Sequence, residues 1–525
     1  MCATSPPPRY GGRTERGSGV RTSVDLPMAA RARIPTVTAP GVQLREEPMR
    51  VDEYVSHDAT ALAELIREGA VKPDEVAEAA AAALDAVQPE LNALVGERFA
   101  EPLAYSADGP FAGVPFAIKD LVLHADGIPQ RAGSRLLGDG VAMPGDSYLM
   151  AQFRAAGLAT MGLTATPELG FNASTEPVAT GPVRNPWDTT RSPGGSSGGS
   201  AALVASRALP MAHANDGGGS IRIPAGCCGL VGLKPTRGRT TPGPDYGDLL
   251  LGLAIEFAVT RTVRDCARLL DAVHGAQPGD RYLLPAPERP FAEEVRAGSR
   301  PLRIAVSTTP SSGPGSVDPQ CVAAVRGVAE QLESMGHTVV EAAPTIDAAA
   351  FDDANLVAWT SFLADAVDQL ATAVGVTPGP DTLEATTLAC AEHGRTLRAA
   401  DLYAADRVFN ATTRAVAAFF TEHDVLLTPT TCAPNTPLGH LDANASGLDA
   451  RGWYDRIFSF AGFTAVSNVT GMPAISLPLG SSAEGWPIGV QLGAGLAGEA
   501  TLLALAADLE RAMPWSDRRP AVVAD

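Results

Sequence analysis

Two serine clusters embedded in glycine are the part of the sequence best suited to chemistry. The first spans 194–200 and reads G-G-S-S-G-G-S, and the second spans 216–220 and reads D-G-G-G-S. Glycine at this density allows backbone conformations and close approaches that a Cβ atom would prevent. A serine hydroxyl becomes a nucleophile only when a base takes its proton, and no His–Asp pairing is evident near either cluster. The clusters therefore predict an active site whose base comes from elsewhere in the chain.

Lys119 is the residue that could supply this base. It stands at the end of a short apolar run, 113–121, between Ile118 and Leu121. Burying an ammonium group is costly, and burial lowers the pKa of a lysine toward the range in which the neutral amine can accept a proton. Taken alone, such a lysine is more typical of a strand end that reaches solvent or pairs with Asp120. The nearby serine clusters are what give it a catalytic interpretation.

Other interpretations of the glycine clusters fit less well. A phosphate-binding loop is not indicated, because no lysine follows the glycines. The hydrolase pattern G-x-S-x-G is matched with either Ser196 or Ser197 at its centre, but a proline-rich loop replaces the strand that should precede it. A flexible linker would suit the first cluster alone. The apolar segments 201–205 and 221–225 instead place both clusters inside a core.

The composition narrows the function classes. The chain has 525 residues, 45% of them apolar, which is typical of a globular protein with a large core. Its net charge of −19 disfavours nucleic acid and anionic membranes as partners, and no run of apolar residues is long enough to span a bilayer. The eight histidines show no metal-ligand spacing, so we expect neither a metal nor another cofactor. Seven cysteines without a regular framework favour a reducing, cytoplasmic location, with Cys227 and Cys228 as buried apolar filler.

The N-terminal part is predicted to be a disordered tail. Residues 1–48 are rich in Pro, Gly, Arg, Ser and Thr and show no apolar periodicity. They lack the apolar run of about 7–15 residues that a secretory signal requires. Met1, Met28 and Met49 each remain candidates for the start of the protein, and folded structure is expected from about residue 49.

From there the sequence alternates between helical and extended patterns. Asp58 is a candidate N-cap for the first helix. The predicted helices cover 59–68, 73–87, 147–156 and 320–335, and the predicted strands cover 113–121, 158–163, 301–306 and 338–340. Helical segments are also expected between about 351 and 420. This alternation predicts an α/β fold.

Several of these segments together resemble the amidase signature family. They are G-V-P-F-A-I-K-D at 113–120, G-G-S-S-G-G-S at 194–200, D-G-G-G-S-I-R-I-P-A at 216–225 and G-L-K-P-T at 232–236. The resemblance continues through 427–430, 468–478 and 486–492 and is weakest between about 279 and 420. It implies one large α/β domain over residues 49–525, with a twisted mixed β-sheet covered by helices on both faces. In this picture, residues 279–420 form a variable region that shapes the substrate pocket.

The resemblance also implies a Ser-cisSer-Lys triad. Ser220 matches the nucleophile, Ser196 the bridging serine and Lys119 the base. Ser196 is preferred to Ser197 because it lies 24 positions before the nucleophile, as in the family. A second hydroxyl between nucleophile and amine can relay a proton in one direction during attack and in the other toward the leaving amine.

The three glycines before Ser220 have an implied role as well. The backbone N–H groups of Gly217, Gly218 and Gly219 can converge on a carbonyl oxygen as it becomes an oxyanion. Asp216 and Arg222 flank this turn with opposite charges and are expected to hold it in place.

The aromatic residues in the variable region allow two structural interpretations. Trp359, Phe362 and Tyr403 lie at helical spacing, which usually indicates core positions. The resemblance adds that this region walls the acyl pocket.

The leading functional interpretation is an amidohydrolase that cleaves a small, non-peptide carboxylic acid amide through a serine acyl-enzyme, releasing ammonia or an amine. The run Asn215-Asp216-Gly217 resembles the subgroup that contains aminohexanoate cyclic-dimer hydrolases. An alternative is a glutamine-dependent amidotransferase subunit that supplies ammonia to a tRNA-dependent partner, and a third is a binding protein with a vestigial triad. A homodimer is compatible with each of them.

Overall fold

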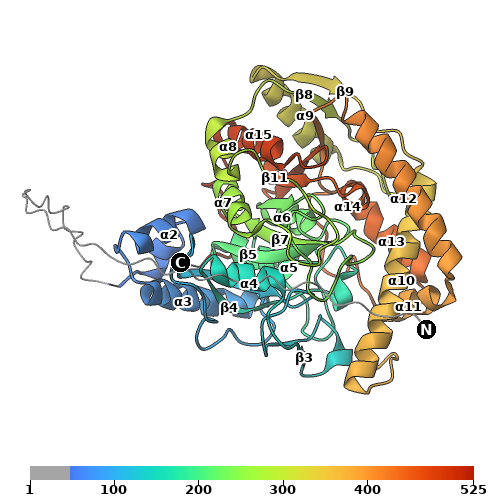
Figure 1. The fold of residues 1–525 in the computed structure, drawn as a ribbon, viewed down its shortest axis with the longest axis horizontal. Helices are drawn as coiled ribbons and strands as arrows, with labels where there is room; N and C mark the ends of the chain where they lie inside the picture. Colours follow the sequence, from blue (N-terminus) through green and yellow to red (C-terminus); the bar gives the residue numbers. More distant parts are fainter. Residues whose placement is uncertain (1–47, 525) are drawn as a thin grey trace, which may run out of the picture. The chain divides into compact units, whose positions relative to one another are not determined.

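The computed structural model describes residues 48–524, so the predicted tail lies outside the described residues except for Pro48. Within this range the chain forms one α/β domain, with fifteen α-helices around an eight-stranded mixed sheet (Figure 1). The α/β fold with a mixed sheet, predicted from the sequence, is confirmed.

The bounds of the elements are as follows. The strands are β1 (Val114–Lys119), β2 (Pro129–Gln130), β3 (Val141–Ala142), β4 (Leu158–Thr164), β5 (Met211–Asp216), β6 (Val231–Lys234), β7 (Ile255–Thr260), β8 (Arg303–Val306), β9 (Thr338–Glu341), β10 (Val425–Pro429), β11 (Ala474–Ser481) and β12 (Pro487–Ala494). The helices are α1 (Val51–Tyr54), α2 (Ala59–Arg67), α3 (Pro73–Leu91), α4 (Tyr148–Ala155), α5 (Gly198–Ala205), α6 (Arg222–Cys228), α7 (Val263–Val273), α8 (Phe291–Ala297), α9 (Pro319–Ser334), α10 (Ala348–Val374), α11 (Ala385–Thr396), α12 (Ala399–Phe419), α13 (Ala450–Phe460), α14 (Ala465–Thr470) and α15 (Glu499–Ala512).

The predicted elements correspond closely to these bounds. Asp58 caps α2 as expected, because its side chain accepts a hydrogen bond from the Ala61 N–H. The predicted β-α-β unit is β8, α9 and β9, and its two strands pair in parallel. Helix α3 runs four residues further than predicted and ends where Asn92 takes a left-handed conformation with φ of 50°.

The large sheet has the order β5-β7-β6-β11-β12-β10-β8-β9. Its pairs are antiparallel from β5 to β10, and β10, β8 and β9 run parallel to one another. Strands β1 and β4 form a separate parallel pair in which every residue is buried. Burial on both faces explains why these two strands read as continuous apolar runs and not as alternating ones.

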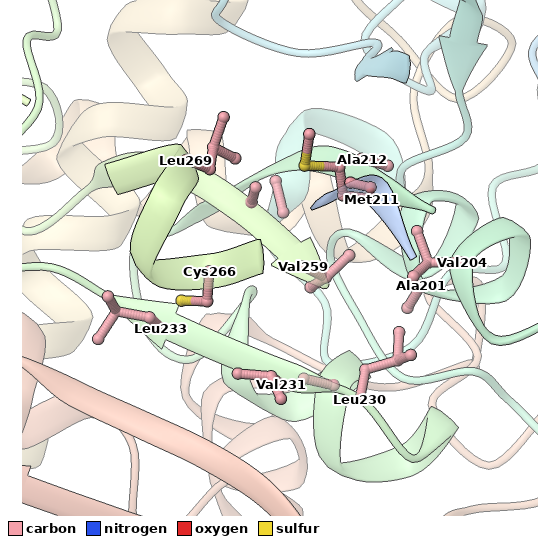
Figure 2. Close-up of a cluster of buried hydrophobic side chains, with 14 of the residues drawn as sticks. Ala201, Val204, Met211, Ala212, Leu230, Val231, Leu233, Val259, Cys266 and Leu269 are labelled. Atoms are coloured by element: carbon pink, nitrogen blue, oxygen red, sulfur yellow. The ribbon is translucent and has the colours of Figure 1, made fainter. Parts of the chain in front are cut away.

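A hydrophobic cluster fixes the elements around the serine-glycine segments. Figure 2 shows side chains from α5, β5, β6, β7 and α7 meeting in one buried layer, among them Val204, Met211, Val231, Val259 and Leu269. Helix α5 begins at Gly198, inside the first serine cluster, and β5 ends at Asp216, directly before the three glycines of the second cluster. The same core therefore holds both segments.

Helices α10 to α13 are drawn in yellow to red-orange along one side of Figure 1. Trp359 on α10 is buried in their core, whereas Phe362 is partly buried. Tyr403 on α12 is 69% exposed, so the expectation that it lies in the core or lines the pocket is wrong. Helical spacing placed all three on helices correctly, but it could not tell which face of α12 is covered.

Six of the seven cysteines lie in the described range, and all six are buried with free thiols. Burial raises the pKa of Cys227 to about 12, which agrees with its reading, together with Cys228, as apolar filler. Across residues 48–524, no helix combines the length and the apolar character needed to cross a bilayer.

Candidate active site

The structure brings the three predicted triad residues together from distant parts of the chain. Lys119 is the last residue of β1, Ser196 lies in the loop before α5, and Ser220 lies in the turn between β5 and α6. All three side chains are buried, and Ser220 is the most accessible of them at 8% exposure. The peptide bond between Gly195 and Ser196 is cis.

The amine of Lys119 has three hydrogen-bond partners. Its Nζ lies 2.7 Å from the Ser196 Oγ, 3.1 Å from the Ser197 Oγ and 2.6 Å from the Asn215 Oδ1. Asp120 does not pair with it, and instead accepts a hydrogen bond from the backbone N–H of Arg131. The interpretation of Lys119 as a strand-end residue that reaches solvent or pairs with Asp120 is therefore wrong.

Burial lowers the pKa of Lys119 to about 7, although the carboxylates of Glu256 and Asp216 act in the opposite direction. Glu256 is itself occupied, because its Oε2 lies 2.8 Å from the Nε2 of His213. The Nδ1 of His213 accepts a hydrogen bond from the backbone N–H of Lys119. Since Nδ1 accepts this hydrogen bond, Nε2 is the ring nitrogen that donates to Glu256, and the ring links the backbone of β1 to β5.

Asp216 and Arg222 form a fully buried ion pair under the turn that carries Ser220. The guanidinium donates to both carboxylate oxygens at 2.9 Å, and also to Asn468 and Gln491. Burial alone would raise the pKa of Asp216, but the charge and hydrogen bonds of Arg222 lower it to about 2. The expectation that this pair holds the turn agrees with these contacts.

The three glycines of the turn have different surroundings. The N–H of Gly219 donates to the Asp216 carboxylate at 2.7 Å, so this donor serves the turn. In the described part of the chain, no acceptor is found for the N–H groups of Gly217 and Gly218. The carbonyl of Gly218 is fixed by the hydroxyl of Thr464 at 2.6 Å. The predicted set of three donors therefore reduces to two that remain available.

The two serine-glycine segments touch each other directly. The backbone N–H of Ser197 donates to the carbonyl oxygen of Ser220 at 3.3 Å. The Ser220 hydroxyl has no hydrogen-bond partner within residues 48–524, and it borders the same cavity as Ser196. Catalytic hydrogen bonds in enzymes without substrate are often long or unformed.

Two small cavities meet at Ser220. They share Ser220, Gly170 and Trp359, and no side chain that lines either of them is charged. Within the described range, the variable region 279–420 contributes only Trp359 and Phe362 to these linings. Among residues 48–524, no group of three or more His, Cys, Asp or Glu side chains is placed to hold a metal ion.

Sequence reasoning missed two partners of the amine. Ser197 was considered only as an alternative to Ser196, and Asn215 only as part of the run that resembles one subgroup of the family. One signal was present: in β5, residues 213 and 215 share a face because side chains alternate along a strand. Their shared approach to Lys119 depends on the neighbouring position of β1, which the sequence does not specify.

A model of the amidase family matches residues 75–503. A 6-aminohexanoate-cyclic-dimer hydrolase of Pseudomonas sp. (strain NK87) is 39% identical over 488 residues, covering 88% of this chain and 96% of that protein. An acylamidase of Rhodococcus erythropolis is 32% identical over 486 residues, covering 88% of this chain and 97% of that protein. The solved structure of a 6-aminohexanoate cyclic dimer hydrolase matches with a TM-score of 0.83 at 37% identity, covering 89% of this chain and 99% of that one.

The backbone of Gly219 generates a prediction about stability. Its φ is 135°, and a Cβ atom there would lie 2.4 Å from the Thr464 Oγ1 and 2.6 Å from the Ile223 Cδ1. Gly219→Ala should therefore lower the free energy of unfolding by about 3 kcal/mol. Gly275→Ala is the matched control, because Gly275 has a φ of 120° with no atom within 4 Å of its Cβ position. It should cost about 1 kcal/mol, and equal losses in urea unfolding would contradict the packing explanation.

Proposed function

The chain belongs to the amidase family and hydrolyses amides, and we propose that it cleaves an uncharged carboxylic acid amide through an acyl-enzyme on Ser220. The observation that carries this proposal is the buried amine of Lys119, which has a pKa of about 7 and lies 2.7 Å from the Ser196 hydroxyl. A lysine with such a pKa is partly neutral near pH 7 and can act as a base.

The partners of the amine set the direction of proton transfer. Neutral Lys119 has two protons and one lone pair. The Asn215 Oδ1 can only accept, so it takes one proton. The Ser197 hydroxyl donates to the Asn215 carbonyl and is therefore free to accept the second proton. The lone pair is left for Ser196, whose hydroxyl must then donate to Lys119.

Ser196 in this orientation offers its oxygen lone pairs to Ser220. During attack, the Ser220 oxygen bonds to the amide carbon, its proton passes to Ser196, and the Ser196 proton passes to Lys119. The path then reverses, and the leaving nitrogen receives a proton as its bond to carbon breaks. Water repeats the sequence on the ester and releases the carboxylic acid.

The negative charge that develops on the carbonyl oxygen also needs donors. We assign this role to the N–H groups of Gly217 and Gly218, which precede Ser220 and are not engaged by described residues. One such donor contributes about 3 kcal/mol to stabilisation of a transition state. Gly219 contributes indirectly, because its hydrogen bond to Asp216 fixes the turn.

The cavity linings favour a neutral substrate. Ser220 lies between surfaces made of apolar side chains, hydroxyls and amides, without a charged group. Glutamine, the substrate of the alternative amidotransferase reaction, carries both a carboxylate and an ammonium group that would be buried there unpaired. The named relatives make small linear and cyclic amides the first substrates to test.

The nucleophile can be tested by labelling. Ser220→Ala should abolish both amide turnover and covalent labelling by a fluorophosphonate probe. Ser196, the other serine that lines the cavities, is already hydrogen-bonded to Lys119, and Ser220 is the one that follows the glycine donors. Ser334→Ala, at the end of α9, is a control that should retain both. Undiminished labelling of the Ser220 variant, measured by mass spectrometry, would assign the nucleophile elsewhere.

The relay can be tested by comparing the two adjacent serines. Ser196→Ala removes the hydroxyl between nucleophile and base, and should lower kcat by about 10³-fold. Ser197→Ala removes only one acceptor of the amine protons, and should lower kcat by about tenfold. Single-turnover kinetics on one amide measures both. A larger loss for the Ser197 variant would make Ser197 the bridging residue.

The pH dependence tests the base. Protonated Lys119 cannot accept a proton, so kcat/KM should fall as the pH drops below about 7. Asn215→Asp places a carboxylate against the amine, favours the ammonium form and should move this limb to higher pH by more than about one unit. Asn172→Asp adds the same charge to the lining of the second cavity at Ser220, without contact to Lys119, and should shift the acidic limb of kcat/KM less. Identical pH profiles for all three proteins would exclude Lys119 as the base.

A further inference from the structure

The indole of Trp359 is held rigidly beside the glycine turn. It stacks on Phe171 with the ring centroids 4.5 Å apart, and only 6% of the residue is exposed. The Cβ position of Gly217 lies 3.1 Å from its Cη2, and the Cβ position of Gly218 lies 3.8 Å from its Nε1. The nitrogen edge of the ring therefore borders the donors proposed for the oxyanion.

The N–H of this indole is a buried donor with no acceptor among residues 48–524. Three other tryptophans place their N–H groups on backbone carbonyls: Trp187 on Cys228, Trp453 on Phe171 and Trp515 on Arg261. Buried polar groups in proteins are nearly always hydrogen-bonded, so an exception needs an explanation.

The position of Trp359 supplies one. Several buried side-chain nitrogen and oxygen atoms in the described chain have no hydrogen-bond partner. Among the residues that carry them, Trp359 is the one that lines the cavities at Ser220. Leu249, Leu250 and Phe362 line the first cavity, and Phe171, Ile457 and Phe458 line the second. A donor in these apolar surroundings gains most from an acceptor that the substrate brings in.

We propose that the indole N–H of Trp359 binds a second carbonyl group of the substrate, so that the preferred substrates are neutral molecules with two carbonyls, such as diamides. This inference rests on the proposed function. The scissile carbonyl already has the Gly217 and Gly218 N–H groups as donors, which leaves the indole for another acceptor. Because no lining side chain is charged, this acceptor is neutral.

A site that hydrogen-bonds one substrate group discriminates strongly against analogues that lack it, since its buried donor is then left unpaired. Stacking on Phe171 also fixes the ring before substrate arrives, so little conformational entropy is lost on binding. Trp359 is thus a specificity-determining residue, and removal of its N–H should reduce discrimination without removing catalysis.

Binding to Ser220→Ala tests this without turnover. The probes are the α,ω-diamides from malonamide to adipamide, each paired with the monoamide of equal chain length, and the measurement is the dissociation constant by calorimetry. Adding Trp359→Phe, which keeps an aromatic ring on Phe171, should weaken the best-bound diamide about tenfold and change its monoamide less than about twofold. The ratio of kcat/KM for the same pair should fall equally in the single Trp359→Phe variant.

Trp515→Phe is the matched control, because its N–H already has an acceptor in the Arg261 carbonyl and Trp515 lines neither cavity at Ser220. It should lower stability and leave the diamide-to-monoamide ratio unchanged. Equal weakening of both probes by Trp359→Phe, or no weakening of any diamide, would overturn the proposal. A different result would contradict the proposed function, namely the absence of amide turnover and of probe labelling in the wild-type protein.

Discussion

On the proposed function, the rest of the structure depends on one constraint, which is that the buried amine of Lys119 can lose its proton near pH 7. Two buried carboxylates, Asp216 and Glu256, lie close enough to favour the charged form of Lys119. Each is engaged by another group, Asp216 by the guanidinium of Arg222 and Glu256 by the imidazole of His213. The contact between Asp216 and Arg222 is an ion pair, and an ion pair attracts a third charge much less than a lone carboxylate does. Arg222 therefore stabilises the turn and also weakens the field with which Asp216 favours the protonated amine of Lys119.

The two glycine-rich segments solve different steric problems around that amine. The first brings Ser196 and Ser197 to Nζ at the start of α5. Its Gly195 and Gly199 pack against backbone, and a Cβ on Gly195 would lie 2.7 Å from the Ser174 carbonyl oxygen. The second turns the chain under Ser220, and there only Gly219 combines a positive φ with a closed space. The Ser197–Ser220 backbone hydrogen bond joins the segments, so a shift in either one moves both hydroxyls.

The sequence was sufficient for the fold class, for the main strands and helices, and for placing Lys119 and Ser196 in one site. These follow from local signals: apolar runs, an N-cap at Asp58, and glycine beside serine. It was insufficient where a property depends on which elements become neighbours. The acceptor role of Asn215 requires β1 to lie beside β5, and the place of Trp359 requires α10 to lie over a turn 139 residues earlier in the chain. The prediction for Tyr403 was wrong for the same reason, because this residue lies on the solvent-exposed face of α12.

The uncharged surroundings of Ser220 also bear on how the reaction ends. On the proposed function, the acyl part enters as a neutral amide and leaves as a carboxylate. Transfer of a carboxylate from water to an apolar site is costly unless a cation meets it, and no cationic side chain lines either described cavity. Lys119 does not fill this role, because it lines neither cavity and its amine is engaged by Ser196, Ser197 and Asn215. The neutrality that selects the amide thus weakens binding of the acid, and the same lining favours both substrate entry and product release.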